Sequence, residues 1–177
     1  MKQGLSEITG LIEVASNASK TLIIISQESE YVMGLKNIFS KYVLQIIFST
    51  PFVHGNSSRI KYGKRISLAN TVLNTGSGDI VIGDDSIFGH NVMLLTGKHD
   101  FIKGKRKKLV TGGPETPKSG YDIFIGSGCW IASGVIVVGG VSIGDNVIIG
   151  AGSIVTKNIR ANVFASGVPA KIIKELI

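Results

Sequence analysis

The 177-residue sequence contains a single cysteine, few aromatic residues and no long apolar run. One cysteine, Cys129, excludes an internal disulfide framework and favours a reducing, cytoplasmic compartment. No apolar run reaches the roughly 18 residues that a membrane-spanning helix requires, and residues 1–30 lack the regions of a secretion signal. Aromatic residues make up only 7% of the chain, which favours a core of stacked aliphatic side chains.

Glycine, valine and isoleucine are abundant instead, and they recur with a period of six between Ile125 and Arg160. Each of the consecutive hexads opens with Ile or Val, and its fifth residue is small or β-branched: Cys129, Val135, Val141, Val147, Ser153 and Ile159. A helix repeats apolar residues every three to four positions and a simple strand every second position, so neither produces this period. The pattern predicts a parallel β-helix in which the first and fifth residues point inward.

Residues 1–58 predict an N-terminal helical region, because apolar residues at helical spacing run through them until Pro51. We favour a helix packed on the β-helix or on a neighbouring subunit over one lying at a membrane interface, since its basic face is thin. Residues 169–177 predict a short C-terminal helix that caps the open end.

Residues 59–168 predict the β-helix domain. Its early hexads place Leu68 and Val72 inward, and the Gly-rich segment 74–81 then adds two residues to the period. The pattern breaks again at residues 97–122, which predict a loop that protrudes from the coil. Long loops on rigid scaffolds are commonly functional.

His99 stands where the coil breaks into this loop, and a positioned imidazole is the usual general base near neutral pH. His90 is the third residue of a hexad and is expected to face solvent, while His54 precedes the repeats. These three histidines are not spaced as a cluster on neighbouring coils, so no metal site is expected. The loop is strongly basic, which favours an anionic ligand; nucleic acid is not expected, because no aromatic residues are interleaved with the charges.

The stretch from Ile66 to Ile173 resembles the hexapeptide-repeat acyltransferases, in particular the branch similar to maltose and galactoside O-acetyltransferases. The matching motifs are Val81-Ile-Gly-Asp-Asp, Leu95-Thr-Gly-Lys-His-Asp, Ile125-Gly-Ser-Gly-Cys-Trp-Ile-Ala-Ser, Ile149-Gly-Ala-Gly-Ser-Ile-Val-Thr-Lys and Gly167-Val-Pro-Ala. The resemblance implies an all-β, left-handed parallel β-helix and a homotrimer with active sites between adjacent subunits. It also implies acetyl-coenzyme A as donor and a sugar as acceptor.

The resemblance assigns roles to individual residues. His99 matches the general base, and Ser133 matches a residue whose backbone N–H stabilises the oxyanion. Trp130 matches the tryptophan near the acetyl and pantetheine end. The resemblance also implies that the pantetheine chain of the coenzyme runs along the coil edge at Gly150, Ala151 and Gly152. Basic residues near the nucleotide phosphates are expected to be Lys157, Lys171 and Lys174.

The acceptor is less well defined by the resemblance. Residues 1–60 do not match the acceptor-binding region of the sugar enzymes, and Ala69, followed by Asn70, replaces their asparagine. His99-Asp100 in place of His-Pro resembles the branch that acetylates sugars of bacterial surface polysaccharides, and Asp100 is a candidate to orient His99. The expected acceptor contacts are Asn70, Asp100, Arg106 and Lys107.

Together these features predict an acetyl-coenzyme A-dependent O-acetyltransferase of a sugar hydroxyl, acting in surface polysaccharide or lipopolysaccharide synthesis. The basic loop favours an anionic acceptor. Two alternatives stay open: an N-acetyltransferase of a nucleotide-linked amino sugar and a non-catalytic β-helix scaffold.

Overall fold

The computed structural model describes residue 34, residues 37–43 and residues 49–176, which fall in two compact units, Met1–Ile46 and Ile47–Ile177. In the first unit, residues 37–43 are helical. The rest of the predicted N-terminal helical region up to residue 48 lies outside the described residues, apart from the single position 34.

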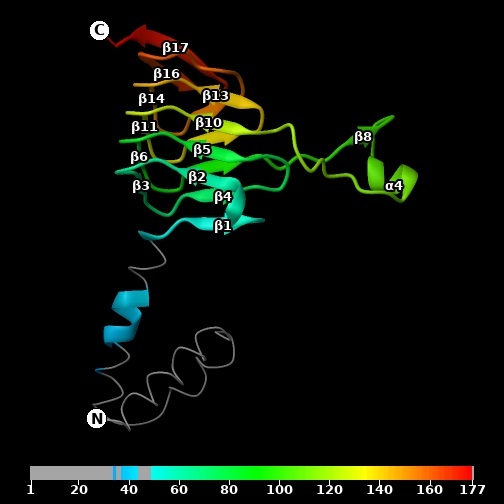
Figure 1. Ribbon diagram of the computed structural model, residues 1–177, viewed down its shortest axis with the longest axis horizontal. Coiled ribbons are helices and arrows are strands. Elements are labelled where there is room, and N and C mark those ends of the chain that lie inside the picture. Colours follow the sequence, from blue (N-terminus) through cyan, green and yellow to red (C-terminus); the bar gives the residue numbers. More distant parts are fainter. Residues whose placement is uncertain (1–33, 35–36, 44–48, 177) are drawn as a thin grey trace. The chain divides into compact units, whose positions relative to one another are not determined.

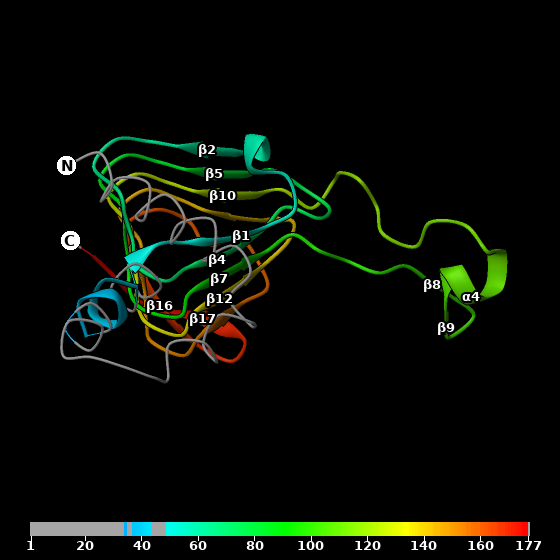
Figure 2. The same ribbon diagram turned by 90° about the horizontal axis from the view of Figure 1, so that it is seen from below.

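The second unit is a parallel β-helix with three faces, shown in Figures 1 and 2. Face A contains β1 (Phe52–His54), β4 (Val72–Asn74), β7 (Met93–Leu95), β12 (Ile136–Val138) and β15 (Ile154–Val155). Face B contains β2 (Ile60–Tyr62), β5 (Ile80–Ile82), β10 (Ile123–Ile125) and β13 (Val141–Ile143). Face C contains β3 (Ser67–Leu68), β6 (Ile87–Phe88), β11 (Trp130–Ile131), β14 (Ile148–Ile149), β16 (Val163–Gly167) and β17 (Ala170–Glu175).

The chain visits faces A, B and C in turn, so each pair of faces meets at an edge where the chain turns. The edge where the chain passes from face A to face B is called edge AB, and the edge where it passes from C to A is called edge CA. A short 3₁₀ helix, η2 (Ser57–Arg59), occupies edge AB in the first coil. This architecture confirms the predicted β-helix.

The core consists of stacked aliphatic columns. On face A, Leu73, Leu94, Val137 and Val155 lie in register, and none of these side chains is exposed. The first and fifth residues of the predicted hexads from Ile125 to Ile159 are all buried. Full burial of each such aliphatic side chain contributes about 1.5–3 kcal/mol to the stability of the fold. The positions that the period of six predicts to point inward therefore form the core.

The phase of the first coils differs from the prediction. Val72 was expected to point inward, but Thr71 and Leu73 are buried on either side of it. Leu68 pairs with Phe88 and Leu73 with Leu94, so the turn before β4 spans five residue steps where the next coil has six. A deletion of one residue at this edge shifts the side chains of β4 to the opposite faces of the strand from those predicted.

Edge AB then compensates for this deletion. Ile80 stacks below Ile123 and Val141, yet it follows Leu73 by seven residues, whereas Val141 follows Val137 by four. The insertion of three residues and the earlier loss of one give the net gain of two that the sequence predicted.

Both ends of the β-helix also differ from the predicted boundaries. The first strand, β1, begins at Phe52, inside the predicted helical region 1–58, and its one inward side chain, Val53, is only half-buried. The predicted C-terminal helix at 169–177 is wrong, because β17 folds back antiparallel on β16 from Gly167, whose φ is 109°. Edge-strand hydrogen bonds favour this hairpin, while a helix so short is marginal alone.

The predicted loop is confirmed as an arm that leaves the prism between β7 and β10 (Figures 1 and 2). Its tip holds a hairpin of β8 (Phe101–Ile102) and β9 (Lys105–Arg106), followed by α4 (Lys107–Thr111). Lys103 and Gly104 both have positive φ, as a two-residue hairpin turn requires.

Candidate active site

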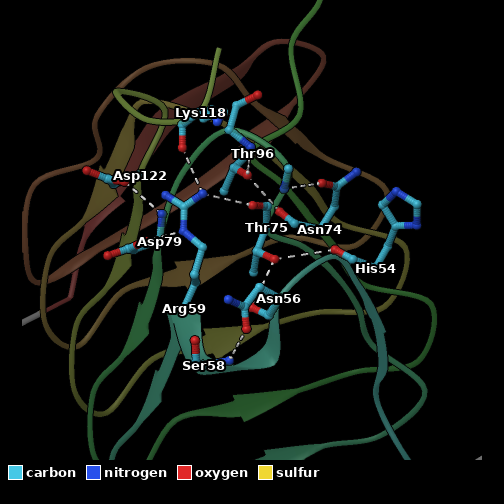
Figure 3. Close-up of polar contacts among 12 residues, drawn as sticks. His54, Asn56, Ser58, Arg59, Asn74, Thr75, Asp79, Thr96, Lys118 and Asp122 are labelled. Carbon is cyan, nitrogen blue, oxygen red and sulfur yellow. Dashed lines mark hydrogen bonds and ion pairs between the residues drawn. The ribbon is translucent and has the colours of Figure 1, made fainter. Parts of the chain in front are cut away.

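The base of the arm is fixed to the first coils by Arg59 (Figure 3). The Nε of Arg59 donates to Asp79 Oδ1 at 2.6 Å, and its Nη1 donates to the carbonyls of Lys118 and Thr75 at 2.8 and 3.2 Å. Asp122, at the end of the arm, accepts a bond from the backbone N–H of Asp79 at 2.7 Å. The returning end of the arm is therefore held at a fixed position on edge AB.

The other strand of the arm's base is held through a lysine. The Nζ of Lys98 donates to the hydroxyl of Tyr121 at 2.5 Å, and the backbone N–H of Lys98 donates to Ser77 Oγ at 3.2 Å. Tyr121 in turn donates its backbone N–H to the carbonyl of Ser77. These bonds immobilise the residue that precedes His99.

His99 contacts Glu115, which belongs to the segment of the arm that returns to the prism. The Nδ1 of His99 is 3.0 Å from Glu115 Oε1, and the backbone of Glu115 accepts a bond from the N–H of Asp100 at 2.7 Å. The Glu115 side chain is only 9% exposed, whereas that of His99 is 59% exposed. A buried carboxylate thus supports an accessible imidazole.

The surroundings of Glu115 keep it ionised. Burial alone would raise the pKa of this carboxyl group, but favourable interactions with three residues outweigh it, and the pKa is lowered overall. His99 contributes a hydrogen bond and its charge, Arg106 contributes its charge at 3.5 Å, and Lys108 contributes its backbone N–H at 3.4 Å.

An ionised carboxylate can only accept hydrogen bonds, so the Nδ1 of His99 must carry the hydrogen that faces Glu115. The Nε2 atom of the neutral ring then holds the free lone pair. This is the tautomer that a general base requires, and the arrangement matches that of an imidazole oriented by a carboxylate.

Sequence reasoning missed Glu115 and named Asp100 as a candidate for this position. The carboxylate of Asp100 instead lies 3.8 Å from the Nζ of Lys107, and its backbone carbonyl accepts from the N–H of Lys107. One signal was available in the sequence: Glu115 is the sole acidic residue between Asp100 and Asp122.

The other expected catalytic residue, Ser133, lies at edge CA, in the turn between β11 and β12. Its Oγ accepts from the backbone N–H of His90, and its carbonyl accepts from that of Gly152. Gly150, Ala151 and Gly152 form the equivalent turn of the next coil. Within the part of the chain that the structure describes, the backbone N–H of Ser133 has no protein acceptor.

Asn70 belongs to the same edge CA, two coils below. Its Nδ2 donates to Asn91 Oδ1 and its Oδ1 accepts from the backbone N–H of Asn91, both at 2.8 Å. Both polar ends of the Asn70 amide are therefore engaged in holding neighbouring coils together.

The expected site residues thus divide between two edges of one chain. His99, Lys157 and the arm residues Asp100, Arg106 and Lys107 belong to edge AB, whereas Asn70, Ser133 and the turn 150–152 belong to edge CA. The strands of face A run from one edge to the other, so a single chain does not bring His99 and Ser133 together. Trp130 is half-exposed on face C, where Lys171 and Lys174 are exposed on β17.

Outward apolar side chains flank edge CA on both sides. On face C, Ile87, Trp130, Ile148 and Phe164 align across four strands. On face A, Val72, Met93, Ile136 and Ile154 form a similar outer column. Contiguous apolar columns of this kind are typical of surfaces that another protein covers.

Two further features of the described residues bear on chemistry. Cys129 is 1% exposed, and burial raises the pKa of its thiol, so it belongs to the core. Across residues 34, 37–43 and 49–176, no three His, Cys, Asp or Glu residues gather as metal ligands, and no helix is long and apolar enough to cross a membrane.

Known proteins share the hexapeptide repeats and the fold of this chain. Residues 122–157 match the family model of the bacterial transferase hexapeptide, six repeats. Galactoside O-acetyltransferase of Lactococcus lactis is 31% identical over 153 residues, which cover 86% of this chain and 70% of that protein. The putative colanic acid biosynthesis acetyltransferase WcaF of Escherichia coli K12 is 34% identical over 100 residues, 56% of this chain and 50% of that protein.

A solved structure of a galactoside acetyltransferase in complex with coenzyme A is 31% identical, with a TM-score of 0.60, and covers 86% of this chain and 74% of its own. The chain spans only about half the length of some relatives. It matches 44% of the galactoside O-acetyltransferase of Escherichia coli K12. The chain belongs to the hexapeptide-repeat acetyltransferases, in the branch similar to galactoside and maltose O-acetyltransferases. This confirms the family that its motifs indicated.

Proposed function

We propose that the protein transfers the acetyl group of acetyl-coenzyme A to a hydroxyl group of a sugar. The observation that carries this proposal is the His99–Glu115 pair at 3.0 Å, which presents an accessible imidazole on a scaffold of the acetyltransferase family. The coenzyme A complex of the similar galactoside acetyltransferase supports the choice of donor.

In the proposed reaction, the Nε2 of His99 accepts the proton of the sugar hydroxyl as that oxygen attacks the thioester carbonyl. The negative charge that develops on the carbonyl oxygen is stabilised by a backbone N–H, for which Ser133 is the candidate. Collapse of the tetrahedral intermediate breaks the carbon–sulfur bond. The departing thiolate takes the proton from His99, which regenerates the neutral base and leaves the acetyl ester.

The coenzyme is proposed to run along edge CA. Ala151 and Gly152 are exposed there and have small side chains, so an extended pantetheine chain would meet little obstruction. Nothing lies within 4 Å of the place where a Gly152 side chain would begin. Lys171 and Lys174 on face C, and Lys157 at edge AB of a neighbouring copy, are exposed cations suited to phosphate groups.

A homotrimer is proposed because one chain does not complete the site. His99 belongs to edge AB and Ser133 to edge CA, so a reaction that needs both requires edge AB of one copy against edge CA of the next. The outer apolar columns beside edge CA, which include Met93 and Trp130, would be covered in this arrangement. Closed rings use such head-to-tail contacts.

A role in surface polysaccharide synthesis is the proposed biological setting. It is supported by the similarity to the putative colanic acid biosynthesis acetyltransferase and by the His99-Asp100 sequence. Sugar hydroxyl acceptors are preferred over amino sugars because the similar protein of Lactococcus lactis, which matches 86% of this chain, is a galactoside O-acetyltransferase.

The test is release of free thiol from acetyl-coenzyme A with a panel of neutral, amino and acidic sugars, using wild type and His99→Ala. We expect release that depends on a hydroxyl sugar and falls roughly 10²- to 10⁴-fold in the variant, while coenzyme binding persists. An unchanged rate in His99→Ala would remove the base assignment. A lack of coenzyme binding by the wild type would favour the scaffold alternative.

A further inference from the structure

The arm carries far more positive than negative charge. Between residues 98 and 118 the acidic residues are Asp100 and Glu115, against the basic residues Lys98, Lys103, Lys105, Arg106, Lys107, Lys108 and Lys118. Both acidic side chains already have partners, Asp100 with Lys107 and Glu115 with His99 and Arg106. The remaining positive charge has no counterion among the described residues of the arm.

Arg106 lies next to the candidate base. Its Nη1 is 3.5 Å from Glu115 Oε1, and the Nδ1 of His99 is 3.0 Å from the same oxygen. Together these two distances put Arg106 Nη1 and His99 Nδ1 at most about 6.5 Å apart, and the Nε2 of His99 lies across the same ring. A monosaccharide ring spans a comparable distance, so a group on the same sugar as the reacting hydroxyl can reach Arg106.

The guanidinium has donors to spare. The contact with Glu115 uses one nitrogen at a long distance, and the Arg106 side chain is 53% exposed. Of the described residues, none other than Glu115 pairs with the side chain of Arg106. Arginine presents five N–H donors in a planar fork that matches carboxylate and phosphate groups. The free donors therefore suit a second anion beside the one that Glu115 supplies.

We infer that Arg106 binds an anionic group of the acceptor, next to the hydroxyl that His99 deprotonates, and so selects an acidic sugar over a neutral one. The inference rests on the proposed function, because it assigns the acceptor of the same site. The shared chemistry is an oxyanion, either a carboxylate on the sugar ring or a phosphate ester. Arg106 is a specificity residue in this arrangement and takes no part in the proton transfer.

The test compares three acceptors that differ at one carbon: a hexuronic acid glycoside, the corresponding hexose glycoside and its 6-phosphate. Each is assayed by thiol release with wild type, Arg106→Gln, Arg106→Lys and Lys105→Gln. Lys105 is the matched control, since it adjoins Arg106 on β9 and successive residues of a strand point to opposite faces.

We expect the wild type to prefer an anionic acceptor. Arg106→Gln should lower kcat/KM for that acceptor roughly 10- to 100-fold through KM, as for loss of one charge-assisted hydrogen bond. It should lower kcat/KM for the neutral hexose by a clearly smaller factor, since Arg106 also pairs with Glu115, and it should leave the KM for acetyl-coenzyme A unchanged. Arg106→Lys should retain part of the preference and Lys105→Gln all of it. Whether the uronate or the phosphate is favoured identifies which oxyanion Arg106 binds.

Other outcomes would overturn the inference. An equal loss on neutral and anionic acceptors would mean that Arg106 acts by holding Glu115 and His99. A rise in the KM for acetyl-coenzyme A alone would assign Arg106 to the phosphates of the coenzyme. A wild-type enzyme that prefers the neutral hexose would also refute the inference that Arg106 selects acidic sugars. A lack of thiol release with every sugar would refute the proposed function itself, which distinguishes the two failures.

Discussion

Glu115 Oε1 and His99 Nδ1 are 3.0 Å apart, although the two residues belong to the outgoing and returning segments of a long arm. We predict that Glu115→Gln lowers kcat roughly 10- to 1,000-fold, because a neutral amide no longer fixes the tautomer of His99 or stabilises the imidazolium. The KM for acetyl-coenzyme A should change little. Steady-state kinetics of the purified variant measure both values.

Asp100→Asn is the matched control for that variant, since its carboxylate faces Lys107 and not His99. It should lower kcat less than Glu115→Gln does. A larger effect of Asp100→Asn would show that the orienting carboxylate is the one that the sequence suggested.

The lowered pKa of Glu115 also predicts a dependence of stability on pH. A carboxyl group whose folded pKa lies below its unfolded value of about 4.3 stabilises the fold above that value, and the stabilisation disappears as the pH falls through the folded pKa. The melting temperature of wild type should therefore exceed that of Glu115→Gln at neutral pH. This difference should shrink as the pH falls below about 4.3 and vanish once Glu115 is protonated in the folded protein, and a difference that grew on acidification would contradict the assignment.

The separation of His99 and Ser133 on two edges predicts complementation between subunits. His99→Ala removes the base at edge AB, and Ala151→Trp blocks edge CA, where Ala151 is exposed. Each variant alone should be inactive. Equal mixtures that are refolded or co-expressed should regain about a quarter of the wild-type activity in the proposed trimer. Half of the sites receive an intact edge AB from one copy, and half of those receive an intact edge CA from the next. Mixtures that stay inactive would place the whole site within one chain.

The core of the later coils could be predicted from the sequence because its period is uninterrupted. Val135, Val147 and Ile149 are fully buried where the hexads put them. The prediction that Val72 points inward was wrong for a physical reason. One residue is missing at edge CA and three are added at edge AB. The sequence shows only the net gain of two residues and not where each change occurs.

Contacts that depend on irregular backbone could not be predicted in this way. Glu115 and His99 are sixteen residues apart in an arm without periodicity, so no spacing rule brings them together. The strand at 170–175 likewise depends on the free edge of β16, where Ile172 pairs opposite Ala165. Such pairing is decided by tertiary structure, not by the local sequence.

Glycines where neighbouring coils touch should tolerate no side chain. A Cβ at Gly83 would lie 2.6 Å from backbone atoms of Gly126 and Ser127 in the coil above. Gly83→Ala should therefore destabilise the protein by about 1–3 kcal/mol, or roughly 2–10 °C in Tm. Gly113→Ala is the control, since its nearest contact would be Thr111 Oγ1 at 3.5 Å. Equal melting temperatures for the two variants would contradict the close stacking of the coils.

Cys129 provides a probe of the core. Its side chain is 1% exposed, its Sγ donates to the carbonyl of Gly144 at 3.1 Å, and burial raises the pKa of the thiol. Only the thiolate reacts rapidly with thiol reagents, so native protein should label at the rate at which the β-helix opens. Labelling should accelerate with urea in parallel with the loss of secondary structure.

The control for this experiment is Ser127→Cys in a Cys129→Ala background. Ser127 is exposed two residues before Cys129, in the turn between β10 and β11. A thiol there should react immediately in native protein, with a rate independent of urea below the transition. If Cys129 of the native wild type reacted as fast as this control, its side chain could not be packed in the column between Ser86 and Val147, and the inward fifth position of the hexad would be wrong at this coil.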